Sequence, residues 1–195
     1  MTNELVKRCQ SGDSAAIETL VHHLTPTIYK TAFSILCNEH DASDAVQETF
    51  IKVLKALPKF RGDASLTTWV YRITTNVCLD MLRAAGRYKT VSPDDEEVFL
   101  QIPDTAPLPE EAAVSSERKK AVRDAINTLP DEYKIIITLC DLEGLPYGEA
   151  AEILRCPLGT VKSRLNRARA ALLKQLSKKR ELFDPEQRQR KDKEA

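Results

Sequence analysis

The sequence has few glycines, few aromatic residues and no long apolar run. Its 195 residues include 6 glycines and 1 tryptophan, and aromatic residues make up 6% of the chain. No apolar stretch is long enough for a membrane span, and the first residues lack the basic-then-apolar layout of an export signal. Apolar residues recur at helical spacing, with little of the alternation typical of strands. We therefore expect an all-α, soluble and cytoplasmic protein that does not insert into a membrane.

Paired cysteines and metal-ligand clusters are also lacking. The 5 cysteines are odd in number and widely scattered, which argues against a disulfide framework. Cys37 and His40, with His22 and His23 upstream, have no second close pair of ligands, so we predict no metal or other cofactor. An enzyme acting on nucleic acid would need clustered carboxylates or a metal site. We therefore expect no catalytic activity.

A net charge is absent, but the charges are segregated along the chain. Lys and Arg total 29, as do Asp and Glu. Within residues 91–117 every charged side chain is acidic, and within residues 158–180 every one is basic. A neutral total therefore does not argue against a polyanionic partner.

Proline and charge divide the chain into four predicted segments. Residues 1–87 and 116–180 each have enough apolar residues to form a small helical domain with its own core. Residues 88–115 combine dense acidic charge with Pro93, Pro103, Pro107 and Pro109, which predicts a flexible linker. Residues 181–195 are mostly polar, and we expect a disordered tail.

The second domain contains a predicted helix-turn-helix. A short helix from Tyr147 to Leu154 is followed by a break at residues 155–157, and Leu158 opens a longer helix. One face of this longer helix is apolar and should pack inward; it comprises Val161, Leu165, Ala168 and Leu172.

The opposite face of the longer helix is suited to the major groove of DNA. It presents Gly159, Ser163, Asn166, Arg167 and Ala170. Small residues allow close approach, and Arg and Asn can bond to base edges. Lys162 and Arg164 flank this face and suit phosphates. The alternative is that this is only a solvated basic helix face. Because the turn, the apolar stripe and a run of charges that are all basic occur together, we favour a helix that recognises DNA bases.

In the first domain, we expect a helix to begin near Ala42, capped by Asp41 or Ser43. Its predicted buried face comprises Val46, Phe50, Val53, Leu54 and Leu57. The outer face carries Asp44, Glu48, Ile51 and Lys55, with Gln47 at its margin. An exposed Ile among acids is either part of a docking patch or an isolated surface residue.

A loop at residues 60–63 precedes another helix, which should begin near Ser65 or Leu66. Its predicted apolar stripe comprises Leu66, Trp69, Val70, Ile73, Val77 and Met81. A polar ledge runs along one edge of that stripe and comprises Thr68, Arg72, Asn76 and Arg83. With Phe60 nearby, such a ledge could hold single-stranded nucleic acid. The alternative is that Phe60 only anchors the loop, and for Trp69 we favour a role in the core.

Taken together, these motifs resemble those of the extracytoplasmic-function sigma factors, in order and at family spacing. The matching runs are Asp44-x-x-Gln47-Glu48-x-Phe50, Phe60-Arg61-Gly62-Asp63, Thr68-Trp69-x-Tyr71-Arg72-Ile73-x-x-Asn76 and Gly159-Thr160-Val161-Lys162-Ser163-Arg164. A single motif would be weak, because the last run also resembles response regulators. The resemblance implies an alternative sigma factor that binds RNA polymerase core through its β′ and β subunits and is restrained by an anti-sigma factor.

The resemblance also implies a role for three sets of residues. The core-binding residues are Asp44, Gln47, Glu48 and Ile51. The −10 residues, which meet single-stranded promoter DNA, are Phe60, Arg61, Thr68, Arg72 and Asn76. The −35 residues, which meet duplex promoter DNA, are Thr160, Lys162, Ser163, Arg164, Asn166 and Arg167. The competing hypothesis is a free-standing helix-turn-helix regulator, but its first domain would need a βα pattern or a ligand pocket, and neither is evident.

Overall fold

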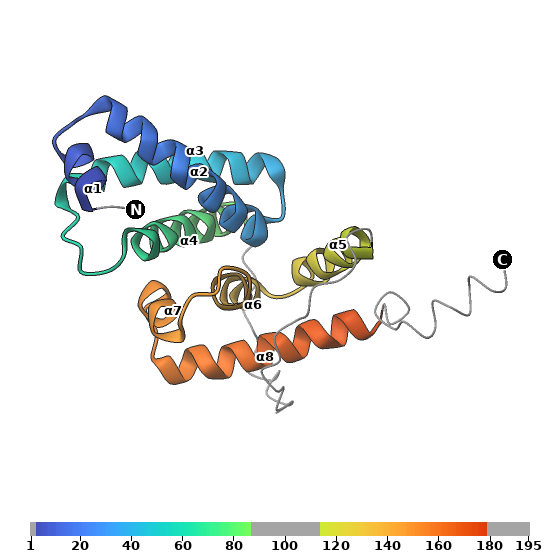
Figure 1. The fold of residues 1–195 in the computed structure, drawn as a ribbon. Coiled ribbons are helices and arrows are strands. Elements are labelled where there is room, and N and C mark those ends of the chain that lie inside the picture. The colour runs from blue at the N-terminus through green and yellow to red at the C-terminus, as the bar shows by residue number, and fades with distance from the viewer. Residues whose placement is uncertain (1–2, 87–113, 179–195) are drawn as a thin grey trace.

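The computed structural model describes residues 3–86 and 114–178, and within these ranges every regular element is helical (Figure 1). The all-α prediction is confirmed. The predicted acidic linker and polar tail lie almost wholly outside the described residues. The N-terminal elements are α1 (Asn3–Gln10), α2 (Ser14–Leu36), α3 (Glu39–Ala56), η1 (Leu57–Lys59) and α4 (Leu66–Ala84). The C-terminal elements are α5 (Val114–Asn127), α6 (Asp131–Ile137), η2 (Thr138–Leu142), α7 (Tyr147–Leu154) and α8 (Leu158–Ser177).

The N-terminal helices enclose a core of their own, in which Leu20, Leu24 and Ile28 of α2 pack with Val53 of α3 and Val70 of α4. The predicted buried face of α3 is wrong at Leu54, which is 37% exposed. The reason is that the centre of the buried face follows Ala42, Ala45, Thr49 and Val53. Leu54 is one helical step beyond Val53 and therefore lies at the margin of that face.

The start of α3 also differs from the prediction. Asn38, not Asp41 or Ser43, is the N-cap, and its side-chain oxygen accepts a hydrogen bond from the Asp41 backbone N–H at 3.0 Å. Cys37 ends α2 in the left-handed conformation, with φ 56°, so that Asn38 is already extended and can cap the next helix. By contrast, α4 begins as predicted, with Ser65 as its N-cap.

The C-terminal helices form a second core around Ile136, Val161 and Leu165. Helix α7 has the bounds that the sequence predicts, and α8 begins at Leu158 as predicted. Pro130, Pro146 and Pro157 stand in extended conformation immediately before α6, α7 and α8. Since proline has no N–H to leave unpaired and its φ is fixed, it starts each helix sharply.

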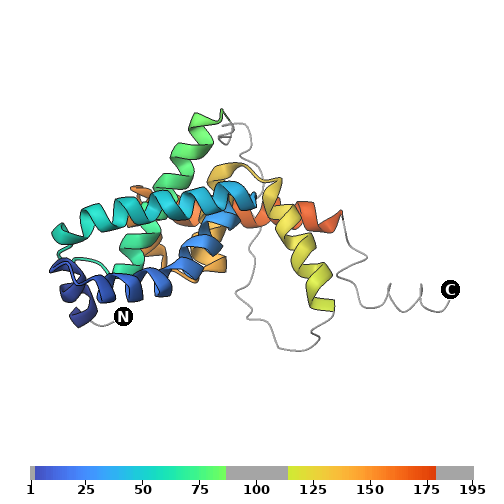
Figure 2. The same ribbon diagram turned by 90° about the horizontal axis from the view of Figure 1, so that it is seen from above.

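A third apolar cluster joins the two groups of helices. Tyr71, Cys78 and Leu82 of α4 belong to it together with Ile135 and Ile153 from the C-terminal helices. The guanidinium of Arg123 lies 5.5 Å from the centre of the Phe33 ring, which adds a contact between α5 and α2. Figures 1 and 2 show α6, α7 and α8 lying along one side of α1 to α4. The two halves are therefore packed face to face.

Within residues 3–86 and 114–178, none of the helices combines the length and the apolar character needed to cross a bilayer.

Candidate functional site

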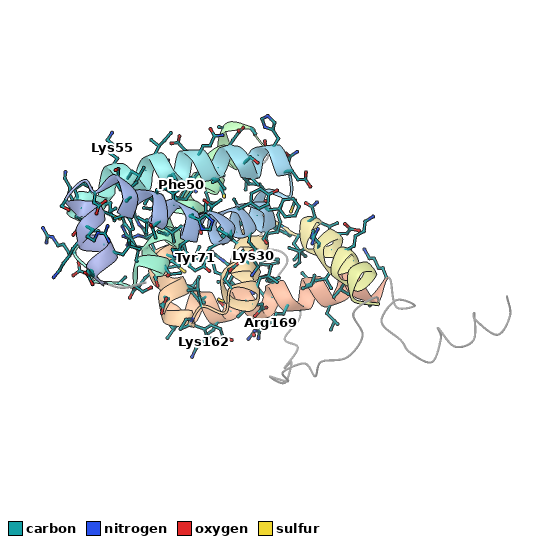
Figure 3. The ribbon with its side chains drawn as sticks, turned by 45° about the horizontal axis from the view of Figure 1, so that its top comes forward. Lys30, Phe50, Lys55, Tyr71, Lys162 and Arg169 are labelled. Atoms are coloured by element: carbon teal, nitrogen blue, oxygen red, sulfur yellow. The ribbon has the colours of Figure 1, made fainter. Side chains whose placement is uncertain are left out.

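The surface of α8 matches the predicted division between a buried and an outer face. Val161, Leu165 and Ala168 are at most 1% exposed, which fixes the rotation of the helix. Lys162, Ser163, Asn166 and Arg167 are exposed as a result, whereas Thr160 and Arg164 are partly buried. Lys162 lies at the outer edge of the molecule in Figure 3. Four of the six predicted −35 residues thus form one accessible surface.

Two arginines of α8 are held by carboxylates from the same half of the molecule. Nη2 of Arg164 lies 3.3 Å from Oε2 of Glu132 in α6. Arg169 donates two hydrogen bonds to Asp141 in η2, at 3.0 Å from Nε and 2.6 Å from Nη2. This bidentate pair raises the pKa of Arg169 further above its usual range. Arg169 therefore links α8 to η2. It is not among the residues that the sequence predicts to be functional.

The predicted core-binding face of α3 is exposed along its length. Asp44, Gln47 and Glu48 are exposed, and Ile51 is 61% exposed, the highest value among the large apolar residues described. Leu54 lies next to Ile51 on the helix surface and is also exposed. The two form an apolar pair beside the carboxylates, which favours a docking patch over an isolated surface residue.

The carboxylates on this face pair with side chains of the same helix. Asp44 Oδ2 lies 3.1 Å from Nδ1 of His40, and Glu48 Oε1 lies 3.6 Å from Nζ of Lys52. Both pairs are solvent-exposed, so water and salt screen them and they can exchange partners readily.

The loop before α4 is tied to α1. Gln10 Nε2 donates to the backbone carbonyls of Leu57 and Phe60 at 3.0 and 2.9 Å. The Phe60 ring is partly buried against Trp69, with 4.9 Å between the ring centroids. Trp69 packs on the N-terminal core, in agreement with the predicted core role. Arg61 in this loop is exposed.

The polar ledge on α4 is less open than predicted. Arg72 is partly buried and Asn76 is exposed, but Thr68 is only 4% exposed. The Thr68 hydroxyl donates a hydrogen bond to Oε2 of Glu149, which comes from α7 in the other half. One predicted −10 residue is therefore covered by the C-terminal helices.

A second acid from the C-terminal helices meets the same region. The hydroxyl of Tyr71 in α4 donates to Oε2 of Glu143 at 2.9 Å, and Lys30 Nζ of α2 lies 3.3 Å from Oε1 of Glu143. Burial raises the pKa of the Tyr71 hydroxyl, and the nearby Glu143 carboxylate raises it further. Nothing in the sequence pattern singles out Glu143, Glu149 or Lys30.

No cluster of three or more His, Cys, Asp or Glu side chains in the described ranges could hold a metal ion.

Comparison with known families identifies both halves. Residues 20–88 match Sigma-70 region 2, and residues 119–172 match Sigma-70, region 4. The ECF RNA polymerase sigma-E factor of Haemophilus influenzae is 37% identical over 174 residues, which cover 85% of this chain and 89% of that protein. The chain belongs to the extracytoplasmic-function (ECF) sigma factor family.

Other sigma factors are also similar to this chain over most of its length. SigW of Bacillus subtilis is 35% identical over 187 residues, which cover 90% of this chain and 97% of that protein. Among solved structures, RpoE of Bartonella quintana in complex with the anti-sigma factor NepR is 28% identical, with a TM-score of 0.63 over 82% of this chain and 96% of that one. The similarity therefore spans both groups of helices.

Within the ECF framework, region 2 includes α3 and α4, and region 4 includes α6, α7 and α8. Arg169, Glu143 and Glu149 lie in region 4, outside the motifs that carried the resemblance. One sequence signal could have pointed to the contact between regions. Helix α4 carries Tyr71, Cys78 and Leu82 in addition to its predicted apolar stripe, and a helix that is apolar on two faces is packed on both.

Proposed function

We propose that this chain is an alternative sigma factor that binds RNA polymerase core and directs initiation at a specific set of promoters. It acts in the cytoplasm as a non-catalytic subunit. The observation that carries the proposal is the presence of regions 2 and 4 in one chain, in order, with an exposed basic recognition surface on α8. Residues 1–87 bind core and the −10 element, residues 88–115 link the domains, residues 116–180 bind the −35 element, and residues 181–195 form a tail.

The core-binding role of α3 rests on its exposed face. Asp44, Gln47 and Glu48 supply polar contacts, and Ile51 supplies an apolar anchor of the kind that contributes strongly at interfaces. Because this face is exposed while the two halves are packed together, core can reach it without any rearrangement. The partner surfaces are the β′ and β subunits.

The promoter-binding roles belong to α4, the loop before it and α8. Phe60, Arg61, Thr68, Arg72 and Asn76 hold the single-stranded −10 element, for which an aromatic ring and hydrogen-bonding groups are suited. The −35 residues enter the major groove, with exposed Asn166 and Arg167 facing base edges and with Lys162 and Arg164 near phosphates.

An anti-sigma factor is the proposed regulator. RpoE of Bartonella quintana was solved in complex with the anti-sigma factor NepR. The similarity of this chain to that protein over both groups of helices supports a related partner, which would compete with core for the exposed α3 face.

Reconstituted transcription tests the proposal. Core polymerase alone and core with the chain are given genomic fragments of the host, and the 5′ ends of the transcripts are mapped. We expect the chain to add start sites that share upstream sequence elements. If the chain instead protects duplex DNA by itself and adds no start sites with core, the free-standing regulator hypothesis holds.

The α3 assignment is tested with Ile51→Asp. We expect affinity for core to fall at least about tenfold, because an apolar anchor is replaced by a charge that must be desolvated in the interface. His23→Asp is the control, since it places an acid on an exposed position of α2. Both variants should keep the helical circular dichroism of the parent. Equal affinity for all three proteins would contradict the docking role of α3.

A further inference from the structure

Helix α1 lies outside the residues that match region 2, which begin at residue 20, yet it contacts the segment that joins α3 to α4 (Figures 1 and 2). Gln10, at the C-terminal end of α1, makes this contact. Its side-chain nitrogen Nε2 donates hydrogen bonds to the backbone carbonyls of Leu57 and Phe60, at 3.0 and 2.9 Å. In the described part of the chain, no other side chain donates a hydrogen bond to residues 57–64. Gln10 therefore ties this segment to α1.

The amide side chain of Gln10 is suited to this contact. Both partners are carbonyl oxygens, which only accept hydrogen bonds, and the two N–H groups of one amide nitrogen can each serve one of them. A carboxylate of the same shape would present only acceptors to the two carbonyls. Gln10 is also partly buried, so its side chain is more than a solvated end of α1.

Helix α1 is itself fixed to the rest of the N-terminal half. Val6 and Cys9 are buried in the N-terminal core. Nε of Arg8 donates a hydrogen bond to Oδ2 of Asp13 at 2.8 Å, and the same carboxylate caps α2 by accepting from two backbone N–H groups in its first turn. The donor on Gln10 thus has a defined position from which it can orient the segment before α4.

The segment that Gln10 holds carries residues proposed to bind the −10 element. Phe60 directly follows η1, and its ring packs on Trp69 with 4.9 Å between the centroids. Arg61 is exposed, and Gly62 has φ 80°, a conformation that glycine adopts without strain. The proposed function assigns Phe60 and Arg61 to single-stranded DNA, and the present inference rests on that assignment. A loop that is ordered beforehand avoids the entropic cost of ordering it on binding.

We propose that Gln10 is a positioning residue for promoter opening. It holds Phe60 and Arg61 in the orientation in which they meet the single-stranded −10 element. Without its donors, residues 57–63 adopt other conformations as well, and only the molecules with the loop in place capture the separated strand. Opening of the promoter therefore slows, while core binding through α3 and duplex binding through α8 stay as in the parent.

Three substitutions of Gln10 separate hydrogen-bond donation from shape. Gln10→Met keeps the length of the side chain and removes the donors, Gln10→Glu keeps the shape and presents only acceptors, and Gln10→Lys keeps donors on a side chain that is one atom longer. The matched control is Lys7→Met, which also removes a donor from α1 but at an exposed position. All four full-length proteins should keep the helical circular dichroism of the parent and its affinity for core.

The first measurement is the rate of promoter opening by holoenzyme, followed with a fluorescent base in the −10 element. We expect Gln10→Met to slow opening about threefold or more, as for the loss of at least one hydrogen bond of ordinary strength. Gln10→Glu should slow it further, because a carboxylate is repelled by both carbonyls. Gln10→Lys and Lys7→Met should open promoters at close to the parent rate. Parent-like opening by Gln10→Met and Gln10→Glu, or an equal defect in Gln10→Lys, would overturn the proposal.

The second measurement follows the loop in the free chain, without polymerase or DNA. The sequence has 1 tryptophan, Trp69, so its fluorescence reports whether Phe60 still packs on it. We expect emission to move to longer wavelength in Gln10→Met and Gln10→Glu but not in Gln10→Lys or Lys7→Met. In Gln10→Glu the shift should diminish as the pH falls through the pKa of the introduced carboxyl, since the protonated form regains one O–H donor. Unchanged emission in both Gln10→Met and Gln10→Glu would show that Gln10 does not hold the loop.

The two measurements separate this inference from the proposed function. If the parent adds no start sites with core, the proposed function fails whatever Trp69 shows. If the parent starts transcription, and Gln10→Met shifts the emission of Trp69 but opens promoters at the parent rate, Gln10 holds the loop without contributing to opening. In that case the positioning role is wrong and the proposed function stands.

Discussion

The two predicted DNA surfaces differ in how they are presented. On α8 the −35 residues Lys162, Ser163, Asn166 and Arg167 are exposed, and the contacts that orient the helix come from region 4 itself. On α4 the predicted −10 residue Thr68 is buried, and its hydroxyl donates a hydrogen bond to Glu149 from the other half. One surface is complete within its own half, and the other depends on where the second half lies.

This difference reflects what each surface has to bind. A recognition helix meets duplex DNA, whose groove and phosphates are present before the protein arrives. The surface proposed for the −10 element would meet bases that become available only after the strands separate. Each of the following changes acts on one surface and should leave the other unaffected.

The largest change in free energy is expected from a substitution in the buried face of α8. Leu165 is 1% exposed in the region 4 core, and Leu165→Ala should lower the free energy of unfolding by about 2–5 kcal/mol through lost burial and a cavity. Leu173, on the same helix, is 50% exposed, and Leu173→Ala should cost less than about 0.5 kcal/mol. Denaturant unfolding followed by circular dichroism measures both. Similar losses for the two variants would show that the buried stripe of α8 has been misplaced.

A smaller effect is expected at the DNA-facing side of α8. Arg167 is exposed beside Ser163 and Asn166, and Arg167→Ala should weaken promoter binding by holoenzyme by about 1–3 kcal/mol. The loss should be concentrated at one base pair of the −35 element, because a bidentate contact to a base edge is removed. Binding to a panel of promoters with single substitutions measures it. A uniform loss across the panel would assign Arg167 to phosphate instead.

The sequence predicted both ends of α7 and the start of α8 to the residue because these boundary signals are local. Proline before each helix, the break at residues 155–157 and an uninterrupted apolar stripe need no knowledge of the rest of the fold. The cap of α3 was missed because Cys37 adopts a left-handed conformation, which is uncommon for a residue other than glycine. Leu54 was misplaced because periodicity alone does not separate the centre of a buried face from its margin.

The candidate site could be predicted only in part, because some of its contacts join helices that are distant in the sequence. Side chains on one helix face can be grouped from spacing, and the exposed residues on α3 and α8 follow from it. Contacts between elements that are distant in sequence cannot be predicted from such spacing. The sequence around Glu143 and Glu149 does not indicate that they accept hydrogen bonds from Tyr71 and Thr68. The pairing of Arg164 with Glu132 is likewise a consequence of tertiary packing.

On α4, Asn76 gives a test that involves strand separation. Asn76→Ala should leave binding of holoenzyme to duplex promoter nearly unchanged and slow opening by about two- to tenfold, as expected for the loss of one hydrogen bond worth about 0.5–1.5 kcal/mol. A promoter melted in advance should restore most of the rate. Opening can be followed with a fluorescent base in the −10 element. Equal defects on duplex and melted templates would indicate lost duplex contact or misfolding, and the contrast with α8 would disappear.

The smallest effect concerns Arg164, which the structure places beside Glu132 at 3.3 Å. Each phosphate neutralised by a cation contributes roughly 0.9 to the slope of log affinity against log salt concentration. Glu132 already neutralises Arg164, so Arg164→Ala should lower the magnitude of that slope by less than about one unit, equally on all promoter sequences. In a Glu132→Gln background the same change should have its full effect of about one unit, because the arginine is no longer compensated. The four proteins form a double-mutant cycle, measured with holoenzyme on one promoter at several salt concentrations. An identical change of slope in both backgrounds would show that the ion pair breaks when DNA binds. A change in base preference caused by Arg164→Ala would show instead that α8 is rotated on the DNA relative to the orientation that its buried stripe predicts.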